Sequence, residues 1–215
     1  LRVTEQTAVF EGLNEPTLAP AIAAAVCGAL LAWLATARGE TLDWLVTFQA
    51  SLVVMAALLG GSIGHAIAVM LLVDLVLARG ILYAVEGVSE ARWIRLSRWV
   101  AAASVSALPP TLGFAGRWLL YRELLANRVL GALLLAVGAS ALATIALGEL
   151  LRVRAPTGRS DRLTTSVLLV PAVATLVLGI GVPWAGPLLE RLTGTTLPSS
   201  LADLAATLTN RLTVV

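Results

Sequence analysis

The chain contains no lysine, and all fifteen of its basic residues are arginine. Arginine keeps its proton in proteins, so any proton relay in this chain must use carboxylates, His65, tyrosine or water. Cys27 is the single cysteine, which excludes an internal disulfide and any iron–sulfur or structural zinc site built from this chain alone. His65 is the single histidine, which excludes a bis-histidine haem site. These absences predict a chain that holds no metal and no cofactor.

Charged residues are also scarce, and hydrophobic residues take their place. The 215 residues are 58% hydrophobic and 13% charged, with a mean hydropathy of +0.89, whereas soluble domains are roughly 45–50% apolar. This composition is that of an integral membrane protein, and its short basic loops face a membrane surface rather than a nucleic acid. Apolar runs long enough to cross a bilayer cover residues 18–37, 43–61, 62–86, 98–121, 129–151 and 163–184.

The predicted fold class is all-α: a polytopic transmembrane helix bundle of about six crossings, with about five or seven as alternatives. Residues 1–17 are predicted to be an extracytoplasmic lead-in and residues 18–190 the transmembrane helical domain. The second run ends in Gly60-Gly61, which favours a tight hairpin with the third run. In the tail, Ser200 and Asp203 fit a capping box, and leucines on one face predict an amphipathic helix over residues 197–215.

The fourth run is interrupted in its middle by Pro109, Pro110 and Gly113. Proline removes a backbone donor and clashes with the preceding turn, so the helix must break or kink there. Lipid cannot satisfy the freed backbone groups, so the break must face protein or a water-filled cavity. Discontinuous helices of this kind mark ion or substrate paths in transporters. The alternative is a simple proline kink in a packing helix.

The third run carries four ionisable residues: His65, Asp74, Arg79 and Glu86. An ionisable group at membrane depth is costly and indicates function by default. At about 100° per residue, His65, Arg79 and Glu86 share one stripe, and Asp74 lies about 140° from Arg79. Asp74 sits near the middle of the run, where a carboxylate must be paired, hydrated or protonated. In the alternative interpretation, Arg79 and Glu86 pair or snorkel, His65 caps an end at the interface, and only Asp74 needs explaining.

Two further charged residues lie near the ends of apolar runs. Glu149 is close to the end of the fifth run, three residues before Arg152, so it is either a functional carboxylate or a local interfacial ion-pair partner. Arg117, just after the broken segment, is predicted to be interfacial.

The distribution of arginine between the two sides predicts the orientation in the membrane. By the positive-inside rule, the richer side faces the cytoplasm, and both termini then lie outside. The cytoplasmic set comprises Arg38, Arg92, Arg95, Arg98, Arg152, Arg154, Arg159 and Arg162, against Arg2, Arg122, Arg128, Arg191 and Arg211 outside.

Residues 107–118, ALPPTLGFAGRW, resemble the signature G-(I/L)-P-P-x-x-G-F-x-x-K of antiporter-like membrane subunits. These are the large proton-translocating subunits of respiratory complex I, membrane-bound hydrogenases and multisubunit sodium/proton antiporters. Arg117 stands where the family often has lysine or another polar residue. The third run resembles a family helix. The register in which more apolar and glycine positions agree places Arg79 at the lysine position, and an alternative register places Val69 there. The matching signature positions are Leu108, Pro109, Pro110, Gly113 and Phe114.

The resemblance implies a reduced or truncated member of this family, because family members have about fourteen crossings in two inverted units. It implies other membrane subunits as partners and a place in the bacterial cytoplasmic membrane, in an assembly such as a respiratory-chain NADH:quinone oxidoreductase whose redox sites lie in other chains. In an active form, Asp74 would be the mid-membrane proton carrier, Arg79 a fixed positive charge that lowers its proton affinity, and Glu149 an exit or coupling carboxylate. In an inactive form, the chain is an accessory spacer.

Two other functions fit the same residues. One is a small stand-alone permease, and the other is a membrane scaffold or assembly subunit without transport activity.

Overall fold

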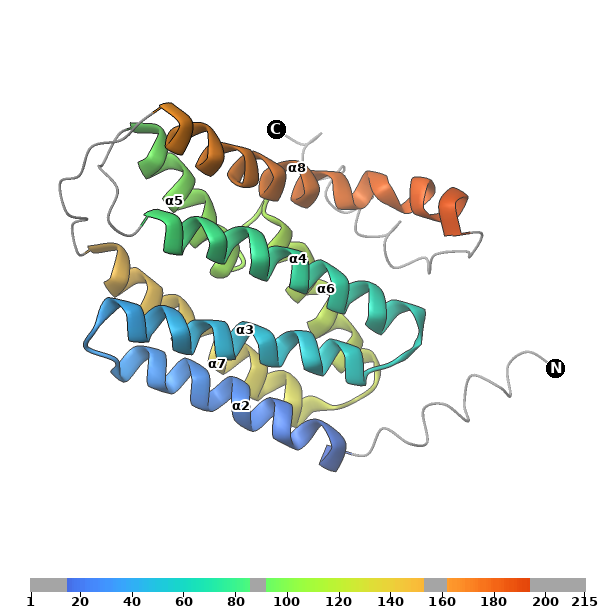
Figure 1. Cartoon of the computed structure of the whole chain (residues 1–215). Coiled ribbons are helices and arrows are strands. Elements are labelled where there is room, and N and C mark those ends of the chain that lie inside the picture. Colours follow the sequence, from blue (N-terminus) through green and yellow to red (C-terminus); the bar gives the residue numbers. More distant parts are fainter. Residues whose placement is uncertain (1–14, 86–91, 153–161, 194–215) are drawn as a thin grey trace, which may run out of the picture.

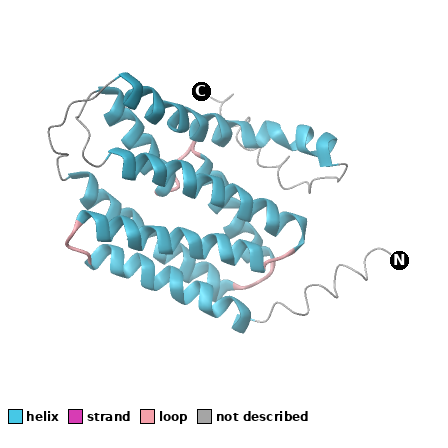
Figure 2. Ribbon diagram, viewed as in Figure 1, coloured by secondary structure: helices cyan, strands magenta, loops and turns pink. Residues whose placement is uncertain are grey.

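The computed structural model describes residues 15–85, 92–152 and 162–193, and this part of the chain consists of helices joined by short loops, without strands (Figures 1 and 2). The predicted lead-in, apart from its last residues, and the predicted amphipathic helix over residues 197–215 lie outside the described residues. The helices, in chain order, are α2 (Glu15–Leu34), α3 (Arg38–Leu58), α4 (Gly61–Val85), α5 (Arg92–Val105), α6 (Leu112–Ala126), α7 (Leu130–Arg152) and α8 (Arg162–Thr193).

The six predicted apolar runs all fall on helices, and the all-α prediction is confirmed. Within the described residues, four helices are long and apolar enough to cross a membrane, namely α2, α3, α4 and α7. The apolar stretch of α8, Thr165–Gly181, is shorter. The fourth run is divided between α5 and α6 by residues 106–111. The chain is therefore an integral membrane protein with one discontinuous helix, and the count of six crossings stays a prediction.

The helices pack in two groups that meet along α3 and α4 (Figure 1). The first group is α2, α3 and α7, and the second is α4, α8 and the α5–α6 pair. Residues 59–60 join α3 to α4, with Gly60 and Gly61 both at positive φ, which confirms the predicted tight hairpin.

Small residues let the helices of the first group approach closely. A methyl group at Gly28 on α2 would lie 2.8 Å from the backbone nitrogen of Phe48 on α3. Close backbone approach through small residues is how helices associate where lipid offers no hydrophobic driving force. The facing stripes are alanine-rich: α2 buries Ala21, Ala25, Ala29 and Ala32, and α7 buries Ala132, Ala136, Ala139, Ala143 and Ala146.

The break between α5 and α6 is closed by a Schellman motif. The amide of Leu108 donates to the carbonyl of Ala103 (2.8 Å), and that of Ala107 donates to the carbonyl of Ser104 (2.9 Å). Ala107 has φ 54°, in the left-handed region that favours glycine. The Pro109–Pro110 peptide bond that follows is cis. Ala107 stands where the signature that the chain resembles has its first glycine, so the motif supplies a physical reason for a glycine there.

We expect Ala107→Gly to stabilise the protein by about 0.5–1 kcal/mol, because glycine avoids the cost of the left-handed conformation. Ala103→Gly is the matched control. The same chemical change inside α5 should instead destabilise by about 0.5–1 kcal/mol. Thermal unfolding of the two variants in detergent checks the opposite signs, and two shifts of the same sign would contradict this explanation.

Candidate functional site

Asp74 lies at the seam between the two helix groups, near the middle of α4, and only 1% of its surface is exposed. Ser104, at the end of α5, donates a hydrogen bond from its hydroxyl to Oδ1 of Asp74. Gln49 on α3 donates from Nε2 to Oδ2 over 3.5 Å, a long hydrogen bond. The carboxylate that the sequence singled out is therefore buried and held from two sides, by one residue of each group.

Ser104 also connects Asp74 to the helix break. The backbone N–H of Gly113, in the first turn of α6, donates to Ser104 Oγ at 3.1 Å. A methyl group at Gly113 would overlap the carbonyl oxygen of Ser104 and lie 2.8 Å from Asp74 Oδ2. The positive end of the α6 dipole thus faces the carboxylate, an arrangement that stabilises a negative charge. The proline break therefore has a polar partner within the protein.

Arg79 is the second predicted residue that the structure places at this seam. It is buried, and its Nε donates to Gln49 Oε1 at 2.8 Å. Its Nη1 and Nη2 are buried without a hydrogen-bond partner among the described residues. Asp74 and Arg79 lie on different faces of α4. They are nevertheless connected, because the side chain of Gln49 on the neighbouring helix hydrogen-bonds to both of them.

Arg117 was predicted to be interfacial, and this prediction is wrong. The side chain, on α6, is 2% exposed. Its Nη2 donates to the carbonyl of Val105, the last residue of α5, at 2.5 Å. Its guanidinium lies over the ring of Phe48, 5.2 Å from the centroid, as in a cation–π contact. Arg117 thus satisfies a carbonyl that the break leaves free, which the sequence position alone could not show.

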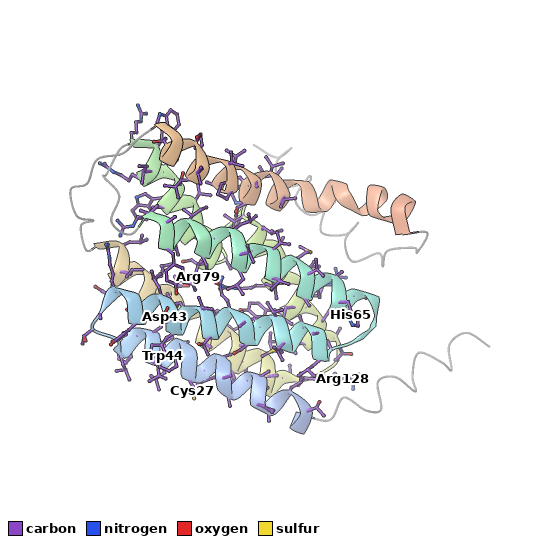
Figure 3. All side chains as sticks on the ribbon, in the orientation of Figure 1. Cys27, Asp43, Trp44, His65, Arg79 and Arg128 are labelled. Atoms are coloured by element: carbon purple, nitrogen blue, oxygen red, sulfur yellow. The ribbon has the colours of Figure 1, made fainter. Side chains whose placement is uncertain are left out.

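Asp74, Ser104, Gln49 and Arg79 form one hydrogen-bonded polar cluster. The other candidates from the sequence lie away from this cluster. His65 is exposed at the opposite end of α4 from Arg79 (Figure 3), with Nδ1 2.5 Å from the carbonyl oxygen of Gly61. His65 and Arg79 therefore do not share one environment, although they share a helical stripe. Glu149 is exposed near the end of α7. Glu86 lies outside the described residues.

The signature residues surround the break without joining the polar cluster, apart from Gly113. Pro109 and Pro110 are exposed, and half-buried Phe114 stacks on Trp118 with ring centroids 6.1 Å apart. The carbonyl of Pro110 packs against α8, where Gly179 leaves room for it.

A second polar contact lies closer to the end of α4. Tyr83, one turn beyond Arg79, donates from its hydroxyl to Asp43 Oδ1 on α3 at 2.5 Å. Asp43 and Arg79 lie toward the same end of the bundle (Figure 3). Polar side chains on the facing sides of α3 and α4 therefore extend from mid-helix toward that end. No group of three or more His, Cys, Asp or Glu side chains that could hold a metal ion occurs in the described part of the chain.

That end of the bundle also gathers arginines from separate helices. Arg38, the first residue of α3, and Arg98 on α5 both donate from Nη2 to the carbonyl of Leu150 on α7, at 3.2 and 3.1 Å. Arginine at a helix C-terminus satisfies free carbonyls and complements the dipole. Two members of the predicted cytoplasmic set thus lie at one end of the molecule.

Sequence reasoning missed Gln49 and Ser104, which complete the cluster. Gln49 is a polar residue in the middle of the second apolar run, and that signal was available. Ser104 carries no such signal, because a serine in an apolar helix most often bonds its own backbone.

No protein-family model and no curated protein matches the sequence. Two solved structures contain chains of the same fold. A chain of the Mrp complex from Dietzia sp. DQ12-45-1b aligns with a TM-score of 0.69 at 20% identity, covering 87% of this chain and 46% of that one. A chain of respiratory complex I from Thermus thermophilus, solved with bound aureothin, aligns with a TM-score of 0.65 at 23% identity, covering 78% and 44%.

The chain spans less than half the length of either matched chain. Respiratory complex I is one of the assemblies to which the double-proline signature pointed. The resemblance stated from the sequence is therefore confirmed at the level of the fold.

Proposed function

We propose that this chain is part of an antiporter-like membrane subunit of an ion-translocating complex, and that Asp74 and the α5–α6 break form part of its ion path. The observation that carries the proposal is a single one: a carboxylate at mid-helix, buried in an apolar bundle, joined through Ser104 to the backbone of a broken helix. The shared fold supports the family, and the sequence signature supports the placement of the break.

The cluster has the physical properties of a site for a mobile positive charge. Burying a carboxylate costs free energy unless hydrogen bonds and opposite charges compensate it. Here two donors, the start of α6, and the nearby charges of Arg117 and Arg79 provide part of that compensation. Asp74 is at the same time the one acidic group of the cluster, so its neutralisation changes the charge of the whole seam. Apolar residues often give a purely structural core the same stability or more.

The proposal includes the surroundings of the chain. Other membrane subunits would supply the titratable groups that a lysine-free chain lacks. The end that carries Arg38 and Arg98 would face the cytoplasm, in a bacterial cytoplasmic membrane, with both termini outside. The proton path would then run from Asp74, past the fixed charge of Arg79, to Tyr83 and Asp43 toward the cytoplasmic end.

The first test is ion flux in membrane vesicles that contain the complete complex, followed with a pH-sensitive dye after pulses of sodium or potassium. We expect Asp74→Asn, which keeps the size but not the charge, to lower flux by about tenfold or more, equivalent to about 1.4 kcal/mol in the barrier. Glu40→Gln is the matched control, because it makes the same change at an exposed position of α3 and should leave flux unchanged.

Unchanged flux in Asp74→Asn would remove Asp74 from the path and leave the accessory-spacer role. Mass spectrometry of the complex, purified in mild detergent, completes the test. Co-purifying membrane subunits are expected. Recovery of the chain alone or as a homo-oligomer would contradict the complex-subunit proposal and favour a stand-alone permease.

A further inference from the structure

The directions of the hydrogen bonds around Gln49 define its amide orientation. Arginine can only donate, so the group of Gln49 that faces Arg79 Nε must be its oxygen, Oε1. The nitrogen, Nε2, then faces Asp74, and because an amide nitrogen can only donate, Oδ2 of Asp74 must accept. Both hydrogen bonds can form in only one orientation of the Gln49 amide.

The other carboxylate oxygen is constrained in the same way. Ser104 Oγ accepts the N–H of Gly113 and gives its own proton to Oδ1 of Asp74. Every hydrogen bond in the cluster thus points toward Asp74, from Arg79 through Gln49 on one side and from Gly113 through Ser104 on the other. The network as a whole is complete only while Asp74 carries no proton.

We propose that Gln49 couples the protonation of Asp74 to the position of Arg79 by turning over its side-chain amide. The inference rests on the proposed function, in which a proton reaches Asp74 along the ion path. The proton binds Oδ2, the oxygen with the longer and weaker hydrogen bond. The new O–H then points at Nε2, which has no lone pair to accept it.

Rotation of the Gln49 amide removes the clash between two donors at Asp74 and creates the same clash at Arg79. Oε1 turns to accept the carboxyl proton, and Nε2 turns toward Arg79, where two donors now face each other. Arg79 loses its hydrogen bond to Gln49, and its Nη1 and Nη2 have no partner among the described residues. A buried guanidinium without acceptors is costly, so Arg79 leaves its position when Asp74 is protonated and returns when the proton departs.

A second position for the Arg79 side chain lies further along its own helix, beside Tyr83 and Asp43. Tyr83 is one turn further along α4, close enough to interact electrostatically with Arg79, and its hydroxyl contacts the carboxylate of Asp43. A shift of Arg79 toward this pair moves a positive charge toward the end of the bundle where Arg38 lies. Gln49 is therefore a positioning residue that links a neutralisation at mid-membrane to a charge movement one turn away.

Among the described groups around Asp74, Gln49 is the one that hydrogen-bonds to both Asp74 and Arg79. The charged side chains near Asp74 are Arg79 on α4 and Arg117 on α6. Arg117 is engaged with Val105 and Phe48. The helices α3 and α5 turn uncharged Gln49 and Ser104 toward the carboxylate, and the described side chains of α8, residues 165–181, include no charged group.

The test uses infrared difference spectra of the complete complex, containing isotope-labelled glutamine, between neutral and acidic buffers. The amide carbonyl band that disappears in Gln49→Met belongs to Gln49, and the carboxyl band that disappears in Asp74→Asn belongs to Asp74. We expect the Gln49 band to shift in step with the appearance of the Asp74 carboxyl band, and to stay in place in Asp74→Asn. Gln49→Leu serves for the assignment if the methionine variant fails to fold.

The outcomes separate this inference from the proposed function. A Gln49 band that stays in place while Asp74 takes up its proton would overturn the inference, whatever the flux. A coupled shift in a complex whose flux is insensitive to Asp74→Asn would support the amide switch and refute the ion path. The absence of an Asp74 carboxyl band at every pH at which the complex stays folded would overturn both.

Discussion

Gly179→Ala is expected to destabilise the protein by about 3 kcal/mol or more, at the upper end of overpacking effects. The added methyl group would overlap the carbonyl of Pro110 and lie 2.6 Å from the backbone nitrogen of Leu112. These are backbone atoms of the break and of the first residue of α6, so they cannot rotate away as a side-chain tip would. Either α8 separates from the break, or the break itself changes conformation.

Gly181→Ala is the control, because it lies two residues further on the same helix and its methyl group would meet no atom within 4 Å. Alanine favours helix over glycine by about 1 kcal/mol, so this variant should be equal to the parent or more stable. Thermal unfolding of both variants in the same detergent gives the comparison. Equal loss of stability in the two variants would show that α8 does not pack on the break through Gly179.

The break is the feature that the sequence predicted best. The chemistry of proline is local: a missing N–H and a clash with the preceding turn act wherever the chain is placed. Pro109 and Pro110 therefore located the interruption, and residues 106–111 confirm it. The Schellman motif at Ala107 was not predicted, because alanine rarely adopts the left-handed conformation and so gives no sequence signal for it.

The environment of each charged residue was harder to predict. Helical periodicity placed His65 and Arg79 on one stripe, yet His65 is exposed and Arg79 is buried. A stripe describes an angle about one helix axis, whereas burial depends on which neighbours cover that helix along its length. Arg117 shows the same limit, because its burial results from the return of α6 against the end of α5. The need of Asp74 for polar partners was predictable, since a carboxylate at mid-helix needs compensation in any bundle; its place in an ion path stays a prediction.

Asp74→Leu is expected to destabilise the protein by about 3–5 kcal/mol, the cost of breaking a buried charge arrangement by removing one partner. The substitution removes the acceptor of Ser104 and of Gln49 and leaves the positive charges of Arg79 and Arg117 in the core without the carboxylate. Unfolding by a denaturing detergent measures the loss. Glu40→Leu, at an exposed position of α3, should change stability by less than about 0.5 kcal/mol.

The double variant Asp74→Leu with Arg79→Leu decides whether charge or packing causes the loss. Removing one of the two arginines with the carboxylate restores the net buried charge of the parent, and replacing a buried pair by apolar residues is often neutral or stabilising. We expect the double variant to recover at least half of the stability that Asp74→Leu loses, while its ion flux stays at the level of Asp74→Asn. Recovery of stability without recovery of flux would mean that the charges of the cluster serve ion flux and are not required for stability. Additive losses would mean instead that Asp74 and Arg79 act as separate packing elements, and the bridge through Gln49 would then carry no energetic coupling.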